Sequence, residues 1–179
     1  THAIRILGHC GPAASTAVPA LKRCFTDKSA QLRSAAAYAL ATMGTAGEAA
    51  LPELEAALQD VAPDVRIAAA LALQSISPAR RPEARALLTL EIRAQQNPGL
   101  RALAGNTLAK MGELTPDLVP GLRALLNGPN DYPRIMAAGA LLRVDPNDAE
   151  ALACLVQPLR NDVHLYASVP ETAANALAA

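Results

Sequence analysis

The sequence is poor in aromatic residues and in cysteine. It has no tryptophan, one phenylalanine and three tyrosines, and its three cysteines, Cys10, Cys24 and Cys154, stand far apart without a CxxC pair. A disulfide framework needs paired cysteines, and base stacking on aromatic rings needs more rings than this chain has. The cysteines are therefore predicted to be small buried or half-buried thiols in a reducing compartment, and we expect a cytoplasmic protein.

An excess of charge of either sign is also absent. Lys and Arg total 16, Asp and Glu total 16, and the isoelectric point is about 6.8. A general nucleic-acid binder carries an excess of basic residues, which this chain does not have. The balance of charge is compatible only with a local basic patch. The apolar runs are short and interrupted by Gly, Pro or charge, so no membrane insertion is expected. The chain opens on THAIRILG and ends on ANALAA within a helical pattern, so we expect a piece of a longer protein.

Hydrophobic residues make up 51% of the chain, and alanine and leucine supply most of that share. A core of small alanines and leucines, with few β-branched residues, favours an all-α structure in which helices approach one another closely.

A repeated segment organises this composition. It reads RSAAAYALATMG at 33–44, RIAAALALQSIS at 66–77, RALAGNTLAKMG at 101–112 and RIMAAGALLRVD at 134–145, at intervals of 33, 35 and 33 residues. Alanine recurs three residues after each arginine, leucine seven after it, and Met, Ile, Met and Val ten after it. Offsets of 3, 7 and 10 share one face of a helix, so each segment is predicted to be an amphipathic helix, here named an arginine helix.

A second predicted helix lies between successive arginine helices. It carries Pro19, Pro52 or Pro120 near its start, where a missing N–H costs nothing, and is named a proline helix. Loops rich in Gly, Asn, Asp and Pro separate the two types of helix. One helix pair cannot bury its own apolar face, so the pairs are predicted to stack into a single array. Its repeats span 1–27 (partial), 28–60, 61–96, 97–128, 129–162 and 163–179 (partial).

This array resembles HEAT repeats, and most closely the short bacterial HEAT-like repeats also found in phycobilisome lyases. Asp27 with Arg33, and Asp60 with Arg66, match the family's turn signature of an aspartate six residues before an arginine. The resemblance implies an α-α superhelix, a right-handed solenoid of about five helix pairs. It also implies that these four residues form a ladder of charge-assisted hydrogen bonds between neighbouring repeats. Gly128 stands where Arg134 would need its aspartate, so the signature is incomplete in later repeats.

Motifs for catalysis or metal binding are missing. The histidines are scattered, the paired His-Glu dipeptides of HEAT-like hydroxylases do not occur, and neither do HExxH, GxSxG, GxGxxG or a phosphate-binding loop. The acidic run DPNDAE at 145–150 lacks the glycine and glutamate of a calcium loop, so Asp148 is predicted to be a helix N-cap. The basic run at 79–85 is interpreted as a solvated helix start. We expect no metal, no cofactor and no enzymatic activity.

Two columns of the arginine helices vary while the core columns stay constant. The resemblance implies that these helices line the concave side of the solenoid, so residues five and nine positions after each arginine are candidates for partner binding. The candidates are Arg5, His9, Tyr38, Thr42, Ser75, Asn106, Lys110 and Arg143. In the five-residue column, Leu71, Gly139 and Asn175 complete the set.

The predicted function is a non-catalytic scaffold that binds a protein or peptide segment with some acidic character along this face. An alternative is a HEAT-like module associated with an enzyme, similar to a bilin lyase or to a regulatory domain. A HEAT-like DNA-binding or repair domain is a further alternative, which the neutral charge and the absence of tryptophan disfavour. The sequence predicts no oligomeric state.

Overall fold

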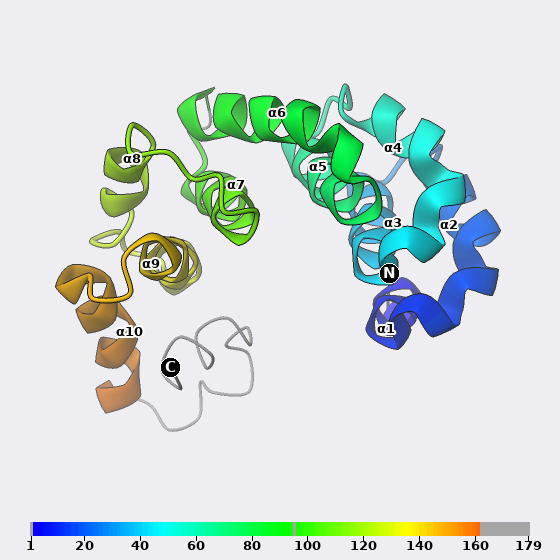
Figure 1. Ribbon diagram of the computed structural model, residues 1–179. Coiled ribbons are helices and arrows are strands. Elements are labelled where there is room, and N and C mark those ends of the chain that lie inside the picture. The colour runs from blue at the N-terminus through cyan, green and yellow to red at the C-terminus, as the bar shows by residue number, and fades with distance from the viewer. Residues whose placement is uncertain (1, 95, 162–179) are drawn as a thin grey trace. The chain divides into compact units, whose positions relative to one another are not determined.

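The protein, seen here as a computed structural model, is described for residues 2–94 and 96–161 (Figure 1). These residues form helices joined by turns, and no strand occurs among them. The α-helices are α1 (His2–Cys10), α2 (Val18–Cys24), α3 (Ala30–Met43), α4 (Leu51–Ala57), α5 (Pro63–Ile76), α6 (Arg81–Ala94), α7 (Pro98–Lys110), α8 (Val119–Arg123), α9 (Asp131–Val144) and α10 (Ala149–Asn161). Short 3-10 segments are η1 (Gly11–Ala17), η2 (Gly44–Ala50) and η3 (Pro78–Arg80).

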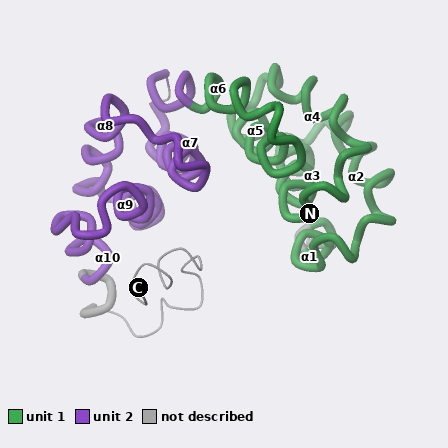
Figure 2. The backbone as a smooth tube through the Cα atoms, viewed as in Figure 1, with its two compact units in different colours: residues 1–88 green, residues 89–179 purple. Residues whose placement is uncertain are grey.

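The chain divides into two compact units, residues 1–88 and residues 89–179 (Figure 2). In unit 1, α3 packs against α1 on one side and α5 on the other, so these three helices form one layer. A second layer consists of α2, which packs on α3, and α4, which packs on α5. The arginine helices α3 and α5 thus share a layer, and the proline helices α2 and α4 share the other.

Unit 2 has the same construction. Its arginine helices, α7 and α9, pack side by side, α8 contacts both of them, and α10 packs on α9. Each unit therefore consists of two-layered helix pairs, as the repeat predicts. The all-α solenoid fold is confirmed, because helices that cannot bury their apolar faces alone do so against the next pair.

The core columns occupy the interior as predicted. Ala36, Ala69, Ala104 and Ala137 are 0% exposed, and the four leucines four residues later are fully or almost fully buried. The third column behaves differently in the two units. Met43 and Ile76 are buried, but Met111 is half-buried and Val144 is 52% exposed. This column stands at the last residue of α3, α5 and α9 and directly after the end of α7, so the helix terminus alone does not account for the difference.

The arginine helices end in two ways that the sequence explains. Gly44 and Gly112 follow the methionines with φ of 58° and 71°, the left-handed region that closes a helix and that glycine enters without strain. At the equivalent positions Ser77 and Asp145 have extended backbones. Each of these two residues precedes a proline, which disfavours the helical conformation in the residue before it.

The cysteines follow the prediction in two of three cases. Cys24 is half-buried and Cys154 is buried, and burial raises the pKa of the Cys154 thiol. Cys10 is exposed instead, because it is the last residue of α1 and the chain turns away at Gly11.

Candidate partner-binding face

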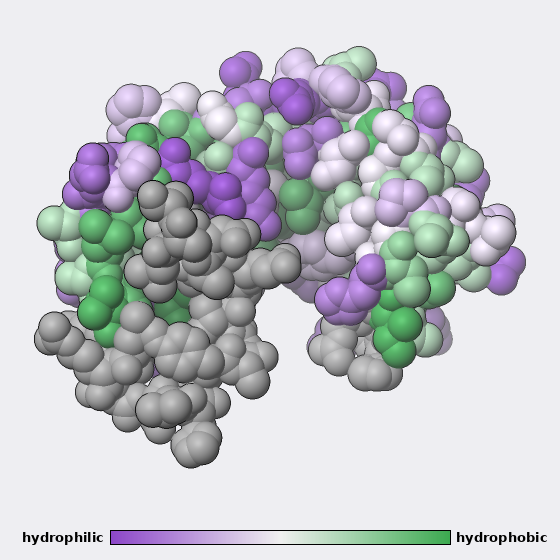
Figure 3. Space-filling view, turned by 60° about the horizontal axis from the view of Figure 1, so that its bottom comes forward, coloured by the Kyte–Doolittle hydropathy of each residue, from purple (hydrophilic) through white to green (hydrophobic). Residues whose placement is uncertain are grey.

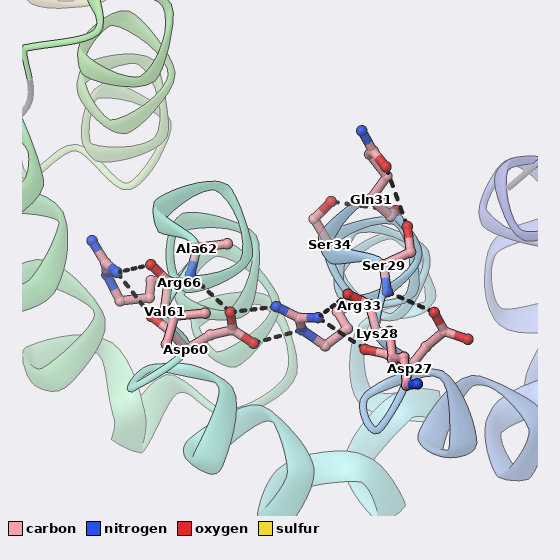
Figure 4. A network of polar contacts seen from close by, with 10 residues as sticks. All are labelled: Asp27, Lys28, Ser29, Gln31, Arg33, Ser34, Asp60, Val61, Ala62 and Arg66. Carbon is pink, nitrogen blue, oxygen red and sulfur yellow. Dashed lines mark hydrogen bonds and ion pairs between the residues drawn. The ribbon is translucent and has the colours of Figure 1, made fainter.

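A chain of polar contacts links the starts of α3 and α5, where the turn signature lies (Figure 4). The guanidinium of Arg33 donates to the carboxylate of Asp60 through two parallel bonds, Nε to Oδ2 and Nη2 to Oδ1, each 2.7 Å long. Its remaining nitrogen, Nη1, donates to the carbonyl oxygens of Asp27 at 2.8 Å and Lys28 at 3.2 Å. One arginine therefore ties the turn before its own helix to the turn of the next repeat.

The same arrangement begins again one repeat later. Nη1 of Arg66 donates to the carbonyl oxygens of Asp60 at 2.8 Å and Val61 at 3.3 Å. The carboxylate of Asp27, by contrast, accepts the N–H of Ser29 at 2.7 Å. Each arginine thus reaches the backbone of the aspartate six residues before it, and the carboxylate that Arg33 binds is that of the following repeat (Figure 4). The six-residue spacing alone does not distinguish these two roles.

This pair is well shielded and electrostatically coupled. The side chains of Arg33 and Asp60 are only 12% and 13% exposed. The hydrogen bonds from Arg33 lower the pKa of the Asp60 carboxyl below its ordinary value, helped by the N–H of Ala62, which donates to Oδ1 at 2.9 Å. In turn, the hydrogen bond to Asp60 raises the pKa of Arg33. Bidentate geometry and low exposure are the conditions under which such a pair orders a structure.

Unit 2 has a different polar link, which the turn signature does not predict. Nη2 of Arg123 in α8 donates to Oδ2 of Asp148 at 2.5 Å, and Nη1 donates to Oε2 of Glu150 at 2.7 Å. Oδ1 of Asp148 also accepts the N–H of Ala151 at 3.0 Å, so Asp148 is the N-cap of α10 that the sequence predicts. The bond from Arg123, together with this cap, lowers the pKa of the Asp148 carboxyl.

The link made by Arg123 has a counterpart in unit 1, made by a basic residue at the same position of its proline helix. Lys22 and Arg123 both stand three residues after the proline of their proline helices. Nζ of Lys22 lies 3.1 Å from Oε1 of Glu53, near the start of α4, as Arg123 contacts Glu150 near the start of α10. A basic residue at this position followed by a glutamate at the next helix start is the signal that could have found both links.

The column nine residues after each arginine lies at the surface in both units. His9, Thr42, Lys110 and Arg143 are exposed, and Ser75 is half-buried. In unit 1 the two hydroxyls bond their own helices, because Oγ1 of Thr42 donates to the carbonyl of Ala39 at 2.7 Å and Oγ of Ser75 to that of Leu71 at 2.9 Å. The hydroxyl protons of Thr42 and Ser75 are therefore already bonded within their own helices.

The column five residues after each arginine lies deeper. Tyr38 and Leu71 are half-buried, and Tyr38 packs against the hydrophobic core of unit 1. Asn106 is only 4% exposed, so its side chain lies below the surface on which we expected it. Gly139 is buried as well. The side chain of Arg5 and the whole of Asn175 lie outside the described residues. Positions on the edge of a helix face are buried or exposed according to the neighbouring helix, which one sequence does not reveal.

Unit 2 carries the charged part of the nine-residue column. Lys110 ends α7 and Arg143 lies in the last turn of α9, the helix packed beside it. Partial burial and the positive charge of Arg143 lower the pKa of the Lys110 amine. On the face that Figure 3 shows, strongly hydrophilic residues gather on the upper left, and others are scattered over the rest of the surface. Two cations held close together favour an anionic ligand.

The described residues contain no group of three or more His, Cys, Asp or Glu side chains arranged to hold a metal ion. None of the helices in that part of the chain combines the length and the apolar character that a membrane span needs.

These features define the chain first as an all-helical repeat protein with stacked two-layer helix pairs. A family model described as HEAT repeats matches residues 1–74, most of unit 1, and supports a HEAT-like repeat for that segment. A search of curated proteins finds no match. HEAT repeats are commonly scaffolds for protein interaction.

Proposed function

We propose that this protein is a non-catalytic scaffold that binds a protein or peptide segment along the arginine helices. The observation that carries the proposal is the nine-residue column. The arginine helices present these side chains at or near the surface, on α1, α3 and α5 in unit 1 and on α7 and α9 in unit 2. In unit 1 the residues one position later, Met43 and Ile76, are buried. Within each unit, a layer of packed helices with one accessible row per helix presents its side chains at regular intervals to an extended ligand.

The composition of the row suits a peptide better than a nucleic acid. It holds hydroxyls, an imidazole and two cations, and the neighbouring Tyr38 supplies one half-buried aromatic ring. The chain has no net charge. A nucleic-acid surface would need basic residues along its whole length, because neutralised phosphates supply most of the affinity.

The test is a selection of binding peptides from a random phage-displayed library on the purified chain. Amide chemical shifts with and without a selected peptide then locate its contacts. We expect the largest shifts around Thr42, Ser75, Lys110 and Arg143. A selection that enriches no peptide, or shifts confined to the proline helices α2, α4 and α8, would contradict the proposed face.

A further inference from the structure

Two cations on the unit 2 part of the row, Lys110 and Arg143, differ from the six cations of the protein for which the structure shows an ion pair. Lys22, Arg33, Arg80, Arg93, Arg123 and Arg134 each lie within 4 Å of a carboxylate. Lys110 and Arg143, in contrast, have no acidic partner among the described residues. Instead they lie close enough to each other for Arg143 to lower the pKa of Lys110. Holding like charges together without a counter-charge costs free energy, and an anionic ligand recovers that cost.

A second observation lies one helical turn before Lys110. Asn106 is 4% exposed, and among the residues that the structure describes no donor reaches its Oδ1 atom. Buried polar atoms in native proteins are nearly always hydrogen-bonded, and an exception calls for a specific reason. Residues four apart on a helix lie on the same side, so Asn106 lies on the side of α7 that carries Lys110.

We propose that Asn106, Lys110 and Arg143 form a binding site for an acidic segment of a partner polypeptide. A ligand carboxylate lies between Lys110 and Arg143, and a backbone N–H of the ligand donates to Oδ1 of Asn106. The side chain of Lys110, which no ion pair holds in place, moves as it takes up the carboxylate and opens this oxygen to the ligand. This inference rests on the proposed function and restricts it to unit 2 and to acidic ligands.

The chemistry of the site favours a polypeptide over a nucleic acid as the anion. A phosphate group supplies charge but no donor for the Asn106 oxygen, whereas every non-proline peptide unit supplies an N–H beside any acidic side chain. In unit 1 the row has no such pair, because Thr42 and Ser75 bond their own helices. The two units therefore differ in the ligands that they select.

The experiment compares peptides from the phage selection with variants of the full chain, using fluorescence anisotropy. We expect the wild-type protein to enrich peptides with Asp or Glu. K110A and R143A should each weaken binding of such a peptide about tenfold, since each removes a charged contact. R81A is the matched control, because Arg81 is exposed in α6 and its removal should leave the affinity unchanged.

Asn106 separates a binding role from a structural one. N106L removes the unsatisfied oxygen, so it should raise the melting temperature while it weakens peptide binding. N106D places a carboxylate of the protein beside Lys110 and should abolish binding of acidic peptides, which keeps the test valid if N106L does not fold.

The outcomes also separate this inference from the proposed function. Peptides without acidic residues that shift only Thr42 and Ser75 would overturn the acidic site and leave the scaffold function intact. If no peptide is enriched, both fail. Tighter binding of a labelled DNA duplex than of the acidic peptide would overturn the choice of a polypeptide ligand.

Discussion

Replacing Gly105 with alanine tests the packing between α7 and α8 most sharply. Gly105 lies in the middle of α7, where a glycine ordinarily weakens a helix by about 1 kcal/mol relative to alanine. A Cβ atom at this position would stand 2.7 Å from Cδ1 of Leu122 and closer still to Cδ2. Carbon atoms pack best at about 3.5–4.0 Å, and Leu122 is fully buried and has little room to turn away.

The two effects oppose each other, and their sizes decide the sign. Overpacking a core costs about 1–3 kcal/mol, and the helix gain offsets about 1 kcal/mol of it. We therefore expect G105A to lower the free energy of unfolding by up to about 2 kcal/mol. Gly121, next to Leu122 in α8, has no other heavy atom within 4 Å of an added Cβ. G121A should raise the free energy of unfolding by about 0.5–1 kcal/mol.

Urea denaturation followed by far-ultraviolet circular dichroism measures both variants. Shortening the leucine in G105A/L122V should restore part of the loss, because it removes the clashing methyl group. If G105A raises the free energy of unfolding as much as G121A does, the inferred clash between an alanine at position 105 and Leu122 is refuted.

Three further predictions concern burial and acid stability. A69L should lower the free energy of unfolding by about 1–3 kcal/mol, because Ala69 is fully buried, whereas A79L at an exposed site should not; equal melting temperatures would contradict this. Arg33 holds the pKa of the Asp60 carboxyl in the folded protein below its unfolded value of about 4. The pair therefore stabilises the fold fully above a pH of about 4, and this stabilisation is lost as the pH falls through the pKa of Asp60 in the folded protein. D60N should therefore be less stable at neutral pH and show a flatter acid unfolding curve than wild type, and an unchanged curve would refute the coupling. D148N should flatten the curve in the same way, since the carboxyl of Asp148 also has a lowered pKa.

The sequence predicts the helices well, because their signals are local. The alanine and leucine columns, Pro52 at a helix start and Gly44 at a helix end all depend on the period and stereochemistry of a helix, which a single chain displays directly. The same holds for Asp148, whose cap requires only the helix that follows it.

Contacts between repeats are harder to predict. The signature places Arg33 six residues after Asp27, yet the carboxylate it binds belongs to Asp60, which is distant in sequence. Arg123 bears no relation to the signature and its partners were missed. Asn106 occupies a variable column but is buried, since burial depends on the adjacent helix rather than on the helix that carries the residue.

A charge exchange at Lys110 and Arg143 tests the proposed site most directly. The measurement is the anisotropy of a labelled acidic peptide from the selection and of its analogue with Lys in place of Asp and Glu, each with wild-type protein and with K110E/R143E. We predict that wild type binds the acidic peptide, more weakly as salt is added, and that the double variant prefers the lysine analogue. Equal binding of the acidic peptide by both proteins would contradict the account.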